Sequence, residues 1–285
     1  MIPDSLRLAV GTLTAVPVRP PRRVDRTVAG RALLWAPLVG LALALLGAVV
    51  IITVRLIGGA PEPAGAWEFR YGWAWVTRNI AADLLAAALA IALLARLTRA
   101  LHLDGLIDTA DGFGVKGEGP DVVARRLAVM RRPDAGAFGV VTVVVVLLVQ
   151  VAALAMCLLT GHGTVGLITA VVTGRLALLW SATPLVRAAR GDGLGAAFAG
   201  SVRVGVAAGV TVAVMALAAG LGALDDDATV RLCVTLAAAV LVGLAGTAML
   251  LRSSARAFGG VTGDVMGAAV ELATATVLVV VAIAG

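Results

Sequence analysis

Residues 135–174 read AGAFGVVTVVVVLLVQVAALAMCLLTGHGTVGLITAVVTG and contain no Asp, Glu, Lys or Arg. A helix of about 20 apolar residues crosses the hydrocarbon core of a membrane, so this stretch is too long for a single crossing. The sequence TGHG at residues 160–163 interrupts it with two glycines, which predicts two membrane-spanning helices joined by a short turn. The segment therefore predicts an all-α, polytopic membrane protein.

Further apolar stretches extend this pattern along the chain. Hydrophobic residues make up 60% of the sequence and charged residues 14%, with a mean hydropathy of +1.02, which is far from the composition of a soluble domain. Together with the two helices above, about seven transmembrane helices are expected. The other five predicted spans cover residues 32–54, 73–95, 204–224, 232–251 and 265–285.

The distribution of basic residues predicts the orientation of these spans. Of the 23 Lys and Arg residues, 18 lie before the first span or in alternate loops after it, on one side of the membrane. The positive-inside rule places that side in the cytoplasm, with the N-terminus inside and the C-terminus outside. We expect a single integral-membrane catalytic domain over residues 1–285, with a cytoplasmic or interfacial segment at residues 1–30.

The basic composition also bears on partners and location. Topology signals and phosphate contacts account for the sequence pI of about 10.8, so we expect a lipid bilayer around the chain and no nucleic-acid partner. The use of 22 arginines against a single lysine, with much Ala, Val and Gly, is typical of a GC-rich bacterial genome. The expected location is the bacterial cytoplasmic membrane, as a multi-pass protein whose active site faces the cytoplasm.

Three carboxylates gather after the second predicted span, in HLDGLIDTADG at residues 102–112. If the helix continues through them, Asp104, Asp108 and Asp111 share one face within an arc of about 60°, at about 100° per residue. Like charges so close together need a neutralising cation, and oxygen ligands of this kind suit Mg²⁺. Residues 96–136 are therefore the predicted cytoplasmic active-site segment, with Mg²⁺ as cofactor. A solvated acidic stretch is the alternative.

Arginines on the same side of the membrane are the expected phosphate-binding groups. The planar guanidinium of arginine makes bidentate contacts with phosphate. The plain positive-inside bias is the alternative explanation for part of this charge. The candidates in the cytoplasmic loops are Arg131, Arg132, Arg187, Arg190, Arg252 and Arg256.

Charged residues inside predicted spans are further site candidates. Arg175 lies near the middle of the fourth span and Glu271 about two turns into the seventh, where each needs a partner or a wet cavity. They line the substrate site or, alternatively, form a buried pair that holds the bundle together. Asp264, on the same helix face as Glu271, is a candidate catalytic carboxylate. His102 is another candidate, but on a continuous helix it lies about 160° from Asp104, which favours a role behind the metal or in packing.

A seam of small residues follows the fifth predicted span. Gly205, Gly209 and Ala213 recur at intervals of four and share one helix face. Such seams allow close helix packing. The seam predicts a tight contact within the chain or between subunits of a homo-oligomer.

The same motifs resemble a known family. HLDGLIDTADGFG at residues 102–114, MRRPDAGAFG at 130–139 and GGVTGDVMGAAVE at 259–271 are similar to the cobalamin synthase family (adenosylcobinamide-GDP ribazoletransferase). The similarity runs over about residues 6–272, nearly the whole chain, and the first string is specific. The chain departs from the family pattern after Met130, because the acid comes two positions late, at Asp134. Asp134 either substitutes for the family's acid or caps the next helix.

The resemblance implies the last step of nucleotide-loop assembly in cobalamin synthesis. Adenosylcobinamide-GDP would be joined to α-ribazole, or its 5′-phosphate, with release of GMP. The resemblance further implies that Asp104, Asp108 and Asp111 hold Mg²⁺, and that arginines grip GDP. Catalytic roles would fall to Asp264, as ligand or base, with Asp111 and His102.

Two other functions remain open from the sequence. A CDP-alcohol phosphotransferase also uses spaced aspartates at a membrane helix end, but its signature differs from the Phe-Gly-Val-Lys that follows Asp111-Gly112. A cation transporter would place carboxylates at the membrane midplane on several helices. The acids of this chain instead collect toward the predicted cytoplasmic ends of the spans.

Overall fold

The computed structural model describes residues 2–58, 68–117, 121–225 and 229–285. Within these ranges the chain forms eleven helices, and the expected all-α fold is confirmed. Their bounds are α1 Asp4–Leu13, α2 Arg26–Gly58, α3 Glu68–Leu97, α4 Leu101–Gly114, α5 Asp121–Val129, α6 Ala137–Leu159, α7 Gly163–Ser181, α8 Gly193–Phe198, α9 Val204–Ala223, α10 Val230–Phe258 and α11 Gly263–Ala284.

Seven helices in the described part of the chain are long and apolar enough to cross a membrane, as predicted. They are α2, α3 (over residues 79–97), α6, α7, α9, α10 and α11. The 40-residue apolar stretch divides at the predicted turn, since α6 ends at Leu159 and α7 begins at Gly163. The protein is therefore a multi-pass membrane protein.

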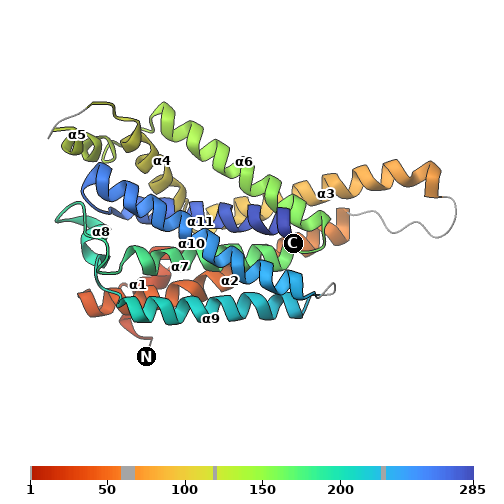
Figure 1. Cartoon of the computed structure of the whole chain (residues 1–285), viewed down its shortest axis with the longest axis horizontal. Helices are drawn as coiled ribbons and strands as arrows, with labels where there is room; N and C mark the ends of the chain where they lie inside the picture. The colour runs from red at the N-terminus through yellow and green to blue at the C-terminus, as the bar shows by residue number, and fades with distance from the viewer. Residues whose placement is uncertain (1, 59–67, 118–120, 226–228) are drawn as a thin grey trace.

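The spanning helices run side by side, and the short helices α1, α4, α5 and α8 gather at one end of the bundle (Figure 1). Helices α7 and α11 form its centre, with 89% and 67% of their most apolar windows buried, against 28% in α6 and 22% in α9. Lipid is as apolar as leucine, so burial here reflects close packing of small side chains rather than expulsion of water. The gathered short helices mark the end of the bundle that carries polar chemistry.

The helix carrying the three aspartates is not a continuation of the second span. Helix α3 ends at Leu97, and Arg99 and Ala100 both adopt a left-handed backbone with φ of 54° before α4 begins. The Arg99 guanidinium donates a hydrogen bond to the Gly11 carbonyl (2.8 Å), which ties this break to the end of α1. The aspartates therefore lie on a separate helix that begins after the second span. The shared face of the aspartates survives, because all three lie within α4.

The predicted small-residue seam does not serve packing within the chain. A methyl group added at Gly205 or Gly209 would meet no atom within 4 Å, and Ala213 is exposed. Of the two predicted uses, only the contact between subunits stays open, as a prediction.

Candidate active site

Helix α4 lies directly against the start of α11, which brings the two acidic segments of the sequence together. A Cβ atom at Gly105 would stand 2.6 Å from the carbonyl oxygen of Asp264, and a Cβ at Gly267 would stand 3.2 Å from the backbone of His102. Such an approach is open only to residues without side chains. The glycines of the two motifs thus place the Asp264 carboxylate beside those of α4.

A short backbone pairing positions the arginine loop next to this contact. The Ala189 N–H donates to the Val261 carbonyl (2.9 Å), and the Val261 N–H donates to the Arg187 carbonyl (2.8 Å). Val261 lies in the turn between α10 and α11. The pairing therefore holds the loop that carries Arg190 and Asp192 against the N-terminus of α11.

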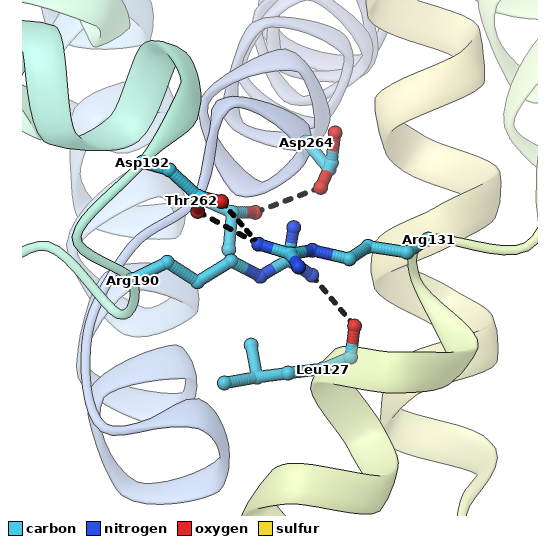
Figure 2. A network of polar contacts seen from close by, with 6 residues as sticks. All are labelled: Leu127, Arg131, Arg190, Asp192, Thr262 and Asp264. Atoms are coloured by element: carbon cyan, nitrogen blue, oxygen red, sulfur yellow. Dashed lines mark hydrogen bonds and ion pairs between the residues drawn. The ribbon is translucent and has the colours of Figure 1, made fainter.

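Figure 2 shows the polar network that results, with side chains from three separate segments of the chain. Arg131, which follows α5, reaches across to Asp192 and contacts both of its carboxylate oxygens at 2.7 Å. The Arg190 guanidinium lies beside that of Arg131 and donates to the Leu127 carbonyl (2.8 Å). The Thr262 hydroxyl donates to Asp264 (3.1 Å). Two arginines thus stand next to the carboxylates, an arrangement suited to a phosphate group.

The carboxylates interact strongly with one another. The pKa of Asp108 is raised to about 7, first by burial and then by the negative charges of Asp264, Asp104 and Asp111, while the positive charge of Arg190 lowers it. A carboxyl group with such a pKa is one whose charge is not yet balanced by the protein. A divalent cation would supply the missing charge, and the donor set consists of the hard oxygens that Mg²⁺ prefers. The chemistry of this acidic cluster (Asp104, Asp108 and Asp264) therefore fits Mg²⁺.

The carboxylates of the acidic cluster do not already surround a single metal position. Among the described residues, no group of three or more His, Cys, Asp or Glu side chains has the spacing of a closed metal site. Asp104 is exposed and Asp108 is half-buried, so both side chains have room to move toward a cation.

Asp111 has partners other than its neighbours on α4. Its carboxylate accepts hydrogen bonds from the backbone N–H groups of Gly136 (2.6 Å) and Gly139 (2.7 Å), at the N-terminus of α6. The first four N–H groups of a helix have no partner within it, and a carboxylate there is also favoured by the helix dipole. Asp111 thus caps α6 from another helix. Asp134, considered for that task from the sequence, is exposed and precedes the N-cap residue Gly136.

A cavity of about 530 Å³ opens beside the acidic cluster, and we call it the site cavity. One wall is polar and includes Asp104, Asp264, Arg131, Arg190 and Asp192. The rest of the lining is mostly apolar and comes from α1, α2, α7, α8 and α11, and we call it the apolar wall. The predicted carboxylates and arginines therefore line the site cavity in part, and Asp108 lies just outside it.

His102 lies on the buried side of α4, as its position relative to Asp104 predicted. It lines the site cavity, yet its side chain is almost fully buried, and neither ring nitrogen has a hydrogen-bond partner among the described residues. Burial holds the pKa of His102 well below its usual range, and the charge of Arg175 lowers it further. The imidazole is therefore neutral at pH 7, and a role in packing fits it better than proton donation.

Arg175 and Glu271 lie apart from the site cavity. Arg175 is buried and Glu271 is half-buried, and both line a small cavity of about 20 Å³, room for about one water molecule. Glu271 accepts a hydrogen bond from the Gln150 side chain on α6 (2.8 Å), and the only ion pairs within 4 Å in the described chain involve other residues. The two charges attract each other at longer range. The structure thus places neither residue at the site cavity and shows no direct ion pair between them.

The remaining predicted arginines divide between two other surfaces. Arg187 joins Arg190 and Arg26 in a second, open cleft of about 910 Å³ that adjoins the site cavity at Arg190. Arg252 lines a mostly apolar groove between α7, α9 and α10. Arg132 and Arg256 are exposed. Of the six arginines predicted as phosphate-binding groups in the loops, Arg131 and Arg190 are those brought to the acidic cluster.

Sequence reasoning did not select two features of this site. Asp192 fixes Arg131, and its sequence signal is the charged residue of the GDG turn at residues 191–193. Helix α1 supplies Leu8, Ala9 and Leu13 to the apolar wall. Residues 1–30 are predicted only as a cytoplasmic or interfacial segment, and nothing in their sequence distinguishes a membrane surface from a cavity wall.

Comparisons with known proteins give one consistent family. The chain matches the family described as Cobalamin-5-phosphate synthase over residues 5–83 and 64–282. A protein of Frankia casuarinae named adenosylcobinamide-GDP ribazoletransferase is 39% identical over 278 residues, covering 97% of this chain and 93% of its own length. Relatives with the same name from a Nocardioides species and from Stutzerimonas stutzeri are 42% and 37% identical, each covering 96% of both chains. No solved structure matches the chain.

Proposed function

Because the chain belongs to the cobalamin-5-phosphate synthase family, we propose that it joins adenosylcobinamide-GDP to α-ribazole, or its 5′-phosphate, and releases GMP. The observation that carries this proposal is the full-length similarity to relatives named for that transfer. The carboxylates and arginines at one cavity supply chemistry suited to it.

The transfer exchanges one phosphorus–oxygen bond for another. A ribose hydroxyl of the acceptor attacks the β-phosphorus of the GDP unit and forms the new ester bond. The bond between the β-phosphorus and the bridging oxygen breaks, and GMP leaves with that oxygen. The hydroxyl proton passes to a base. Such transfers depend mainly on positioning and on stabilisation of negative charge.

We assign Mg²⁺ to the acidic cluster. Asp104 and Asp108 are the proposed ligands on α4, and Asp264 on α11 completes the set or accepts the proton of the attacking hydroxyl. Asp111, predicted as a third ligand of α4, is assigned instead to holding α4 against α6, because both of its oxygens accept backbone hydrogen bonds. When bound, the cation would neutralise charge on the transferring phosphoryl group and on departing GMP.

Arg190 and Arg131 are the proposed clamp on the diphosphate. Arg190 lines both the site cavity and the second cleft, so a diphosphate that spanned the two would lie beside this residue. Its Nε is buried without a partner in the described structure, which leaves a donor for an incoming anion. Asp192 holds Arg131 in place through both carboxylate oxygens.

Release of GMP is the direct test of this function. Purified protein in lipid nanodiscs should form GMP from adenosylcobinamide-GDP only when α-ribazole or its 5′-phosphate is present. Excess EDTA should stop the reaction and added Mg²⁺ should restore it. GMP formation at the same rate without α-ribazole would indicate a hydrolase. If folded wild-type protein released no GMP at all, the proposed function would be refuted.

The proposed location is the bacterial cytoplasmic membrane, with the site cavity on the cytoplasmic side where nucleotides are. Cysteine labelling tests this orientation. In a background with Cys157 and Cys233 changed to alanine, a membrane-impermeant maleimide applied to intact cells should label Leu224→Cys and leave Lys116→Cys unlabelled. Both positions are exposed and lie at opposite ends of the bundle. The reverse labelling pattern would show the opposite topology, with the site cavity on the side of the membrane that lacks cytoplasmic nucleotides.

A further inference from the structure

The site cavity has two kinds of wall, and its apolar wall has no task in phosphoryl transfer. That wall is built from the side chains Leu8, Ala9, Leu13, Ala32, Leu33, Leu178, Phe198 and Met266. It lines the same cavity of about 530 Å³ as the carboxylates of Asp104 and Asp264. Ligand sites for small molecules commonly measure about 300–1,000 Å³ and are mostly apolar with a few polar groups. The cavity therefore has the size and character of a site for one small molecule.

The chemistry of the wall discriminates between the groups that the proposed reaction brings together. Guanine carries a carbonyl, a ring N–H and an amino group, which would lose their hydrogen bonds to water against leucine, phenylalanine and methionine side chains. The corrinoid is a macrocycle ringed by amides, too large and too polar for this space. The base of α-ribazole is a dimethylbenzimidazole, a flat bicyclic ring with methyl groups at its edge. It matches an apolar wall.

We propose that the site cavity is the acceptor site, with the dimethylbenzimidazole of α-ribazole against the apolar wall and its ribose toward Asp104 and Asp264. This inference rests on the proposed function and adds the place and orientation of one substrate. With the base on the apolar wall, the ribose hydroxyls reach the polar wall where the phosphoryl group arrives. The donor's diphosphate then enters past Arg190 from the second cleft, which shares that residue with the site cavity.

Helix α1 offers a matched pair of variants for the test. Leu8 and Leu6 are both half-buried leucines of α1, but Leu8 lines the site cavity and Leu6 does not. The Leu8→Ala variant should raise the KM for α-ribazole about ten-fold, leaving the KM for adenosylcobinamide-GDP and the kcat at saturating acceptor within two-fold. The Leu6→Ala variant should leave all three values unchanged. Filling the cavity with Thr12→Trp should raise the KM for α-ribazole by at least as much.

Direct binding separates failure of this inference from failure of the proposed function. Equilibrium dialysis of radiolabelled α-ribazole with wild-type protein in nanodiscs requires no turnover, and Thr12→Trp should weaken the binding about ten-fold or more. A rise in the KM for adenosylcobinamide-GDP alone, or unchanged α-ribazole binding in folded Thr12→Trp, would overturn the acceptor assignment. Binding at the cavity without any GMP release would instead refute the reaction and leave the site in place.

Discussion

Replacing Asp108 with alanine should lower the rate of GMP release at saturating substrates by about a thousand-fold, the scale expected when one charge-stabilising group is lost from a transfer site. Asp108 stands near the carboxylates of Asp264, Asp104 and Asp111, whose charges together with burial raise its pKa. Removing it would take away a proposed Mg²⁺ ligand. The thermal unfolding midpoint should stay the same or rise, because repulsion within the acidic cluster is relieved.

The control for Asp108 is another carboxylate of the same end of the bundle. Asp121 is exposed at the start of α5 and lines neither the site cavity nor the second cleft. The Asp121→Ala variant should release GMP at the wild-type rate. Near-normal turnover in Asp108→Ala would remove this residue from the proposed ligands, whatever the control shows.

Replacing Asp111 with alanine should lower both stability and turnover, for a different reason. The change leaves the N–H groups of Gly136 and Gly139 without their acceptor and frees α4 from the start of α6. Loss of a charged cap of this kind costs about 1–3 kcal/mol of folding free energy. The thermal unfolding midpoint in detergent should therefore fall by several degrees. The Mg²⁺ concentration for half-maximal rate should stay within about three-fold of the wild-type value in the activity that remains.

Thr229 provides the matched control for a lost helix cap. Its hydroxyl accepts a hydrogen bond from the Leu232 N–H at the start of α10, at the opposite end of the bundle from the acidic cluster. Thr229→Ala should reduce stability modestly and leave the rate of GMP release unchanged. If Asp111→Ala keeps wild-type stability but loses its response to Mg²⁺, Asp111 is a metal ligand and the capping assignment is wrong.

Much of this fold could be predicted from the sequence, because lipid makes the length and charge of each apolar stretch decisive. The turn at residues 160–163 and the start of α11 were predicted to within a few residues. The break between α3 and α4 could not be predicted in the same way. Arg99 and Ala100 are ordinary helix formers, and their left-handed backbone depends on contacts with α1 that are remote in sequence.

The candidate site also has parts that the sequence predicts and parts that depend on contacts between distant segments. The family resemblance places the carboxylates of α4 and α11 in one site, and the structure shows that Gly105 and Gly267 allow the two helices to touch. The partner of Asp111 could not, since helical spacing fixes which face a residue occupies but not which helix covers it. The apolar wall likewise depends on α1 folding back over the bundle. A charge pattern identified the arginine loops, yet only tertiary contacts select Arg131 and Arg190 from six candidates.

The central claim is that the acidic cluster of α4 and α11 holds the divalent cation on which transfer depends. Electron paramagnetic resonance of Mn²⁺ added to the protein in zwitterionic nanodiscs measures this directly, with empty nanodiscs as the blank. Wild-type protein should bind about one Mn²⁺ per chain in competition with Mg²⁺, Asp111→Ala should retain that binding, and Asp108→Ala and Asp264→Ala should lose it together with GMP release. Wild-type Mn²⁺ binding in a folded Asp108→Ala, Asp264→Ala double variant would contradict the claim.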